Sequence, residues 1–185
     1  IISVCVSVGA IFYRNEIMAL LYLSGDAYSG SIFGWLMVSF ICKSLTYIYG
    51  SLLTAGGKIA LLNKISLVGF AINLIFNLLL IPKYLALGSA IATVAAQILV
   101  LFAHVIASEK SFQLTKSLQQ WLKSALFIAM VVGINLLIAQ LHINWVYALV
   151  ISGLVSFLAV FPSTILTVSE VRQFLRTMSG EVSKK

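Results

Sequence analysis

Six long apolar runs, separated by short polar stretches, occupy most of the chain. They cover residues 1–13, 31–53, 59–81, 85–107, 124–141 and 145–168. None alternates with the period of two that marks a barrel strand, and about 20 apolar residues are enough for a helix to cross a bilayer. The pattern predicts an all-α, polytopic membrane helix bundle of about six transmembrane helices, the first one truncated. We expect residues 1–168 to form this bundle and 169–185 to form a basic amphipathic tail.

Composition supports a membrane setting. The chain is 61% hydrophobic and only 9% charged, whereas a soluble domain is roughly 25% charged. This excludes an ordinary water-soluble globule. The net charge of +7 comes from basic residues that are scattered between the apolar runs, so nucleic acid is not an expected partner.

The basic residues instead predict how the chain is oriented in the membrane. If the C-terminal tail is cytoplasmic, most Lys and Arg fall at cytoplasmic ends: Lys58, Lys64, Lys110, Lys116, Lys123, Arg172, Arg176, Lys184 and Lys185. Only Arg14 and Lys83 then lie on the opposite side. Cytoplasmic loops of membrane proteins carry an excess of Lys and Arg. The sequence therefore predicts a multi-pass protein with a cytoplasmic C-terminus.

Two amphipathic stretches lie between the runs. Residues 14–30 predict a short interfacial helix that ends in a Gly-Asp turn, and residues 108–123 predict a segment along the cytoplasmic interface. In the last run, Pro162 predicts a bend.

Acidic residues are absent from the apolar runs. Every carboxylate falls in a loop, an interfacial stretch or the tail: Glu16, Asp26, Glu109, Glu170 and Glu181. An intramembrane protease or a pump that carries protons on a buried acid would need one at depth. No nucleophile and base pair is visible either, so we expect no enzyme activity, no cofactor and no metal. Cys5 and Cys42 are interpreted as small core residues.

One basic residue, Lys43, lies near the middle of an apolar run. Ser39, Lys43, Tyr47 and Gly50 recur at helical spacing and form one polar stripe. A charge at this depth is costly, which favours a water-filled cavity or an anionic partner. The alternative is that Lys43 snorkels to the membrane interface.

The third and fourth runs carry further polar stripes and one face of small residues. The polar positions are Ser66, Asn73 and Asn77 beside Gly69, and then Ser89, Thr93, Gln97 and His104. Such groups either form hydrogen bonds between helices, the commoner case, or line a cavity. A lone His is more often structural than a proton carrier. We take Lys43, Ser39, Tyr47, Asn73, Asn77 and Gln97 as candidate residues of a substrate cavity.

The short turn at residues 82–87, followed by Gly88, Ala92 and Ala96, predicts that the third and fourth helices form a close hairpin. Small residues at this spacing let two helix backbones approach each other.

Part of this region resembles a known family. Residues 73–84, NLIFNLLLIPKY, and 88–93, GSAIAT, resemble the signature N-x-x-x-N-x-x-L-I-P-x-Y-G followed by G-A-A-I-A-T. This signature is typical of polysaccharide (O-antigen and exopolysaccharide) flippases. Their superfamily also holds lipid II flippases and multidrug and toxin extrusion transporters. The stretches LYLSGDAY at 21–28 and LLTAGGK at 52–58 are similar to two further family motifs. Two departures are Leu85, where the family tends to have Gly, and Ser89, where it has Ala.

The resemblance implies the C-terminal portion of a fourteen-helix flippase, with its N-terminal lobe as a missing partner. Such a protein moves an undecaprenyl-diphosphate-linked oligosaccharide across the bacterial cytoplasmic membrane by alternating access, among membrane lipids and without covalent chemistry. Two alternatives stay open. One is a fragment of a multidrug and toxin extrusion-type cation antiporter, which the lack of acids at depth disfavours. The other is a non-transporting membrane scaffold of a polysaccharide assembly complex.

Overall fold

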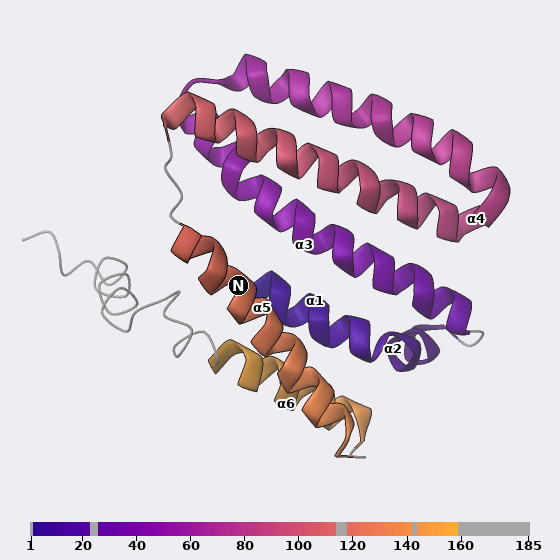
Figure 1. Ribbon diagram of the computed structural model, residues 1–185. Coiled ribbons are helices and arrows are strands. Elements are labelled where there is room, and N and C mark those ends of the chain that lie inside the picture. The colour runs from indigo at the N-terminus through magenta and orange to yellow at the C-terminus, as the bar shows by residue number, and fades with distance from the viewer. Residues whose placement is uncertain (1, 23–25, 114–117, 142–143, 159–185) are drawn as a thin grey trace, which may run out of the picture. The chain divides into compact units, whose positions relative to one another are not determined.

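The computed structural model describes residues 2–22, 26–113, 118–141 and 144–158, and all regular structure within these ranges is helical (Figure 1). The helices are α1 (Ile2–Phe12), α2 (Arg14–Leu21), α3 (Ala27–Ala55), α4 (Ile59–Phe112), α5 (Leu118–Ala139) and α6 (Trp145–Leu158). The chain divides into two compact units. One comprises residues 6–115, and the other comprises 1–5 and 116–185. The all-α class is confirmed for the described residues.

The described residues contain two helices, α3 and α4, that are long and apolar enough to cross a membrane. A third candidate span arises if α1 and α2, which meet at an angle of 80°, are counted together. The apolar segment 125–139 of α5 and helix α6, 145–158, are shorter. A bundle of about six spans is thus not confirmed. Much of the difference arises because α4 joins two of the expected runs in one bent helix.

Helix α4 folds back on itself at Leu85, whose φ of 52° and ψ of −130° are not helical. Figure 1 shows the two resulting arms, residues 59–84 and 86–112, running side by side. A β-carbon added at Gly69 would overlap a methyl group of Val100, and one added at Gly88 would overlap the backbone carbonyl of Leu80. Only glycine permits so close an approach of backbones. The predicted close hairpin is confirmed.

The bend in α4 is held by a side chain from another helix. The hydroxyl of Tyr28, in the first turn of α3, donates to the carbonyl of Tyr84 at 3.1 Å and accepts from the backbone N–H of Leu87 at 3.2 Å. The dihedral angles of Leu85 are those of the first central residue of a type II′ turn. In such a turn, the residues equivalent to Tyr84 and Leu87 are often joined by a direct hydrogen bond. Here the hydroxyl of Tyr28 joins them.

The N-terminal half of α3 packs against α2. A β-carbon added at Gly30 would meet Asn15, and one added at Gly34 would lie 3.2 Å from Cδ of Arg14. Asp26 is the N-cap of α3 and accepts from the backbone N–H of Ser29 at 2.8 Å. The short helix expected within 14–30 is therefore present as α2, and no residue of α2 is buried. Gly25 of the predicted turn lies outside the described residues.

Helices α5 and α6 contact each other in the other unit. Asn135 is fully buried, and its amide nitrogen donates to the carbonyl of Val131 at 2.9 Å. The predicted interfacial segment 108–123 does not form a helix of its own, because residues 108–112 continue α4 and residues 118–123 belong to α5. Pro162 and the predicted tail, 169–185, lie outside the described residues.

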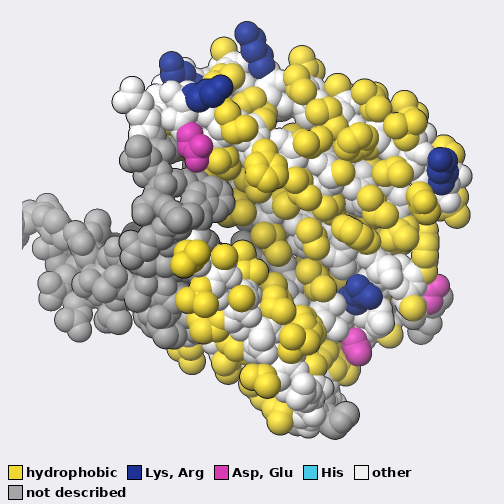
Figure 2. Space-filling view, viewed as in Figure 1, with side chains coloured by type: hydrophobic (Ala, Val, Ile, Leu, Met, Phe, Trp, Pro, Cys, Tyr) yellow, Lys and Arg dark blue, Asp and Glu magenta, His cyan; other side chains and the backbone are white. Residues whose placement is uncertain are grey.

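Both arms of α4 expose large apolar side chains. Leu67 is 70% exposed, and its neighbours along the first arm are similarly open: Val68, Phe70, Leu74, Ile75, Leu78 and Leu79. Figure 2 shows hydrophobic side chains over most of the visible face of α4. A surface of this kind is unusual for a water-soluble protein and typical of one covered by lipid.

A polar cavity between α3 and α4

Helix α3 and the two arms of α4 line an open cavity of about 900 Å³. Only the C-terminal half of α3 contributes, because its N-terminal half packs on α2. The lining residues are Lys43, Thr46, Tyr47, Gly50, Ser51, Thr54 and Ala55 of α3, Leu62, Ser66, Gly69, Phe70 and Asn73 of the first arm, and Thr93, Ala96, Gln97, Val100 and His104 of the second arm. The volume lies at the upper end of the range for small-molecule sites.

Gly50 of α3 lies close to both arms of α4. A β-carbon at Gly50 would lie 3.7 Å from a methyl group of Leu62 and 3.9 Å from Cδ2 of His104. Helix α3 therefore touches both arms of α4 at this point. Six residues further along, the ring of Phe112 lies over Gly56.

Hydroxyl groups form much of the polar wall. Thr46 donates to the carbonyl of Cys42, Thr54 to that of Gly50, and Thr93 to that of Ser89, each at 2.9 Å. Because each hydroxyl hydrogen is used within its own helix, the oxygen lone pairs remain as acceptors. These threonines can therefore accept hydrogen bonds from a ligand without leaving a carbonyl unpaired.

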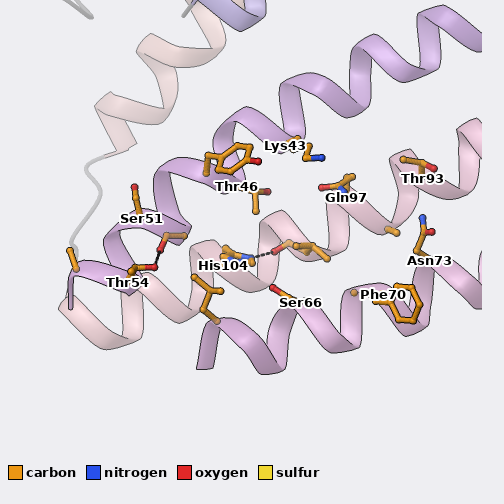
Figure 3. A pocket seen from close by; sticks show the side chains of 17 residues that line it. Lys43, Thr46, Ser51, Thr54, Ser66, Phe70, Asn73, Thr93, Gln97 and His104 are labelled. Carbon is orange, nitrogen blue, oxygen red and sulfur yellow. Dashed lines mark hydrogen bonds between the residues drawn. The ribbon is translucent and has the colours of Figure 1, made fainter. Parts of the chain in front are cut away.

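The donors come from longer side chains. Figure 3 shows Lys43 and Gln97 directed into the space between the helices, with Asn73 on the facing arm. The side-chain oxygen Oδ1 of Asn73 accepts from the side chain of Asn77 at 3.0 Å. This leaves the side-chain amide hydrogens of Asn73 for other partners. The ammonium group of Lys43 and the amides of Asn73 and Gln97 are thus donors on the described part of the wall.

His104 is 3% exposed and also faces the cavity. Its Nδ1 lies 2.9 Å from the carbonyl oxygen of Val100. Since a carbonyl only accepts, Nδ1 carries the hydrogen and Nε2 is left as an acceptor in the neutral ring. This bond ties the ring to its own helix, in line with the structural role that the sequence favoured, and at the same time places it on the cavity wall.

The six candidates from the sequence do not all reach the cavity. Lys43, Tyr47, Asn73 and Gln97 line it. Ser39 is buried and lies outside the lining, one turn nearer to the contact with α2. Asn77 is also outside, and its side-chain nitrogen donates to the backbone carbonyl and to Oδ1 of Asn73, so the two amides pair within one helix instead of between helices.

Sequence reasoning missed three hydroxyl residues of α3, namely Thr46, Ser51 and Thr54. They continue the stripe of Lys43 and Gly50 at spacings of three and four toward the end of the helix. Thr46 lies within the length of the stripe, and extending the stripe toward the C-terminus would have found Ser51 and Thr54.

The chemistry of this wall suits a polar ligand with negative charge. No Asp or Glu is among the lining residues that the structure describes, so an anion meets no repulsion from a neighbouring carboxylate. The described residues contain no group of three His, Cys, Asp or Glu side chains that could hold a metal ion. A wall that carries a lysine, amide donors and hydroxyl acceptors can bind phosphate and sugar hydroxyls.

No protein-family model matches the chain, and neither a curated protein nor a solved structure does so.

Proposed function

We propose that this chain is the C-terminal portion of a polysaccharide flippase, which moves undecaprenyl-diphosphate-linked oligosaccharide across the bacterial cytoplasmic membrane by alternating access. In this proposal α3 and each arm of α4 cross the bilayer, within a multi-pass protein whose C-terminus is cytoplasmic. The cavity between them forms part of the substrate path, and the second lobe of the transporter completes it.

The observation that carries the proposal is the composition of the cavity wall. Lys43 is its one cation among the described lining residues, and the other polar groups are hydroxyls, amides and a histidine. A diphosphate with attached sugars needs a positive charge at one point and many neutral hydrogen-bonding groups elsewhere. The absence of Asp and Glu from the described wall supports this substrate over the cation that an antiporter would bind.

The bend of α4 gives a second line of support. The flippase signature has glycine after its tyrosine, and Leu85 occupies that place in this chain. Leu85 is also the residue with positive φ at the bend. Glycine is favoured at such a position, so the signature's glycine corresponds to a turn that this chain makes.

Export of glycan by cells that depend on this protein tests the proposal. Replacing Lys43 by Glu in the complete protein puts a negative charge where the diphosphate would bind. We expect glycan export to fall at least tenfold, since charge-assisted hydrogen bonds contribute about 1.5–3 kcal/mol. Lys43→Arg keeps the charge and is expected to retain part of the activity.

The matched control is Lys83→Glu, which makes the same change at an exposed lysine beside the bend of α4. It should leave export unchanged, with both variants present in the membrane at wild-type amounts. Normal export by Lys43→Glu would contradict the proposed role of the cavity.

A further inference from the structure

A second hollow lies between the arms of α4 and differs from the cavity in character. It is a groove of about 220 Å³. Its wall is formed by Lys64, Ile65, Val68, Gly69, Ile72, Leu99, Val100 and Ala103. Gly69 and Val100 touch each other and border both spaces, so their contact separates the groove from the cavity. Apart from Lys64, the groove presents no polar side chain.

The groove has the length and the apolar surface to take part of a hydrocarbon chain. It runs along the first arm from Lys64 to Ile72, which at 1.5 Å per residue is about 12 Å. Val68 is 59% exposed and Leu99 is 46% exposed, so the groove opens outward from the hairpin. The absence of a β-carbon at Gly69 deepens its floor.

Positive charge is concentrated at one end of the groove. Lys64 lies at that end, Lys58 precedes the first residue of α4, and Lys110 is in its last turn. Because the arms are antiparallel, these three exposed lysines share one end of the hairpin. Figure 2 shows Lys and Arg side chains gathered there, with a single acidic side chain beside them. Glu109 is the acidic residue of that turn.

We infer that this groove binds one anionic phospholipid, with an acyl chain along Val68, Ile72 and Leu99 and the phosphate at Lys64. An apolar slot that ends at a lysine cluster matches both parts of such a molecule. Basic pockets between membrane helices bind anionic headgroups, and they do so on the cytoplasmic side. The excess of Lys and Arg predicts the same side for Lys58, Lys64 and Lys110. The inference does not depend on the proposed transport function.

Quenching of tryptophan fluorescence by brominated lipid tests the inference. The reporter is Phe102→Trp, placed one turn from Leu99, in a full-length chain whose three native tryptophans are replaced by Phe. The protein is reconstituted in vesicles of phosphatidylcholine that contain dibromo-phosphatidylglycerol or dibromo-phosphatidylcholine. We expect the anionic lipid to bind beside the reporter at least fivefold more strongly than the zwitterionic lipid, since each lysine near the surface contributes about a fivefold preference.

Two further measurements separate the groove from general attraction to the membrane. Lys64→Gln should reduce the preference about fivefold, whereas Lys83→Gln, at the opposite end of the hairpin, should leave it unchanged. A reporter at Leu78→Trp, which is exposed but outside the groove, should show no preference. Any one of three results would overturn the inference. They are equal quenching by the two lipids at Phe102→Trp, an unchanged preference for the anionic lipid in Lys64→Gln, and the same preference at Leu78→Trp.

Discussion

Replacing Leu85 by glycine should stabilise the protein. Leu85 has a φ of 52° at the bend of α4, a backbone region that side chains with a β-carbon rarely adopt. Such a residue stores about 1–3 kcal/mol of strain. Glycine relieves this strain but loses about 0.5–1 kcal/mol more conformational entropy on folding. Leu85 is 69% exposed, so removing its side chain costs little packing. The net expected gain is about 1 kcal/mol.

The measurement is the free energy of unfolding in mixed detergent micelles, followed by helical circular dichroism during titration with a denaturing detergent. Leu85→Ala is the matched control, because it removes the same exposed side chain and keeps the β-carbon that causes the strain. Leu85→Gly should be more stable than Leu85→Ala by about 1 kcal/mol. If the glycine variant is equally stable or less stable than the alanine variant, the strain assigned to this bend is wrong.

Three other substitutions probe the packing of the same unit. Tyr28→Phe removes both hydrogen bonds at the bend, about 1–2 kcal/mol in all, and should speed hydrogen exchange of the Leu87 amide about 5- to 30-fold. Gly69→Ala should destabilise by about 1–3 kcal/mol because its methyl group overlaps Val100, and adding Val100→Ala should recover most of the loss in a double-mutant cycle. Hydrogen bonds from the backbone and the hydroxyl of Ser29 hold the pKa of Asp26 below its usual 3.8, so Asp26 stabilises the start of α3 above about pH 4. This stabilisation is lost as the pH falls through the lowered pKa, and Asp26→Asn should remove that part of the acid dependence of unfolding.

Two of these experiments have a control within the chain. Tyr84→Phe leaves the backbone carbonyl that accepts from Tyr28 and should not change exchange at the bend. Gly88→Ala meets a backbone carbonyl instead of a side chain, so no single side-chain truncation should rescue it. Unchanged exchange in Tyr28→Phe would contradict the hydrogen bonds of Tyr28 at the bend. Failure of Val100→Ala to rescue Gly69→Ala would contradict the contact between Gly69 and Val100. An Asp26→Asn protein with the acid dependence of the wild type would contradict the stabilising role of Asp26.

The hairpin could be predicted from the sequence because its determinants are local. Pro82 and the following turn residues lie next to Gly88, Ala92 and Ala96 in the chain, and all three small residues are buried in the structure. Spacing along one helix was enough to place them on one face. The Tyr28 hydroxyl at the bend could not be predicted, since it comes from a residue more than fifty positions away and depends on how α3 packs against α4.

The cavity was predicted less completely for the same reason. Lys43 and Tyr47 of the predicted stripe lie on the cavity wall, but periodicity does not say where along a helix its neighbours change. Ser39 lies on that stripe and is buried outside the cavity lining, because the N-terminal half of α3 packs against α2. Asn77 was grouped with Asn73 by spacing. In the structure, the side chain of Asn77 bonds to that of Asn73 and does not line the cavity. The count of about six spans stays a prediction: α4 is counted as one helix although its two arms correspond to two of the apolar runs, and part of the last run lies outside the described residues.

Water access to the cavity in the membrane is the most direct test of the central claim, that α3 and α4 line an open cavity with polar side chains within a lipid-covered unit. Gln97→Cys places a thiol on the cavity wall, and Leu99→Cys places one two residues away, on the groove face of the same arm. Both are made with Cys5 and Cys42 replaced by Ala, and both are treated in intact membranes with a hydrophilic maleimide. The account predicts rapid labelling at position 97 and none at position 99. Equal labelling of the two positions, or labelling only at position 99, would contradict it.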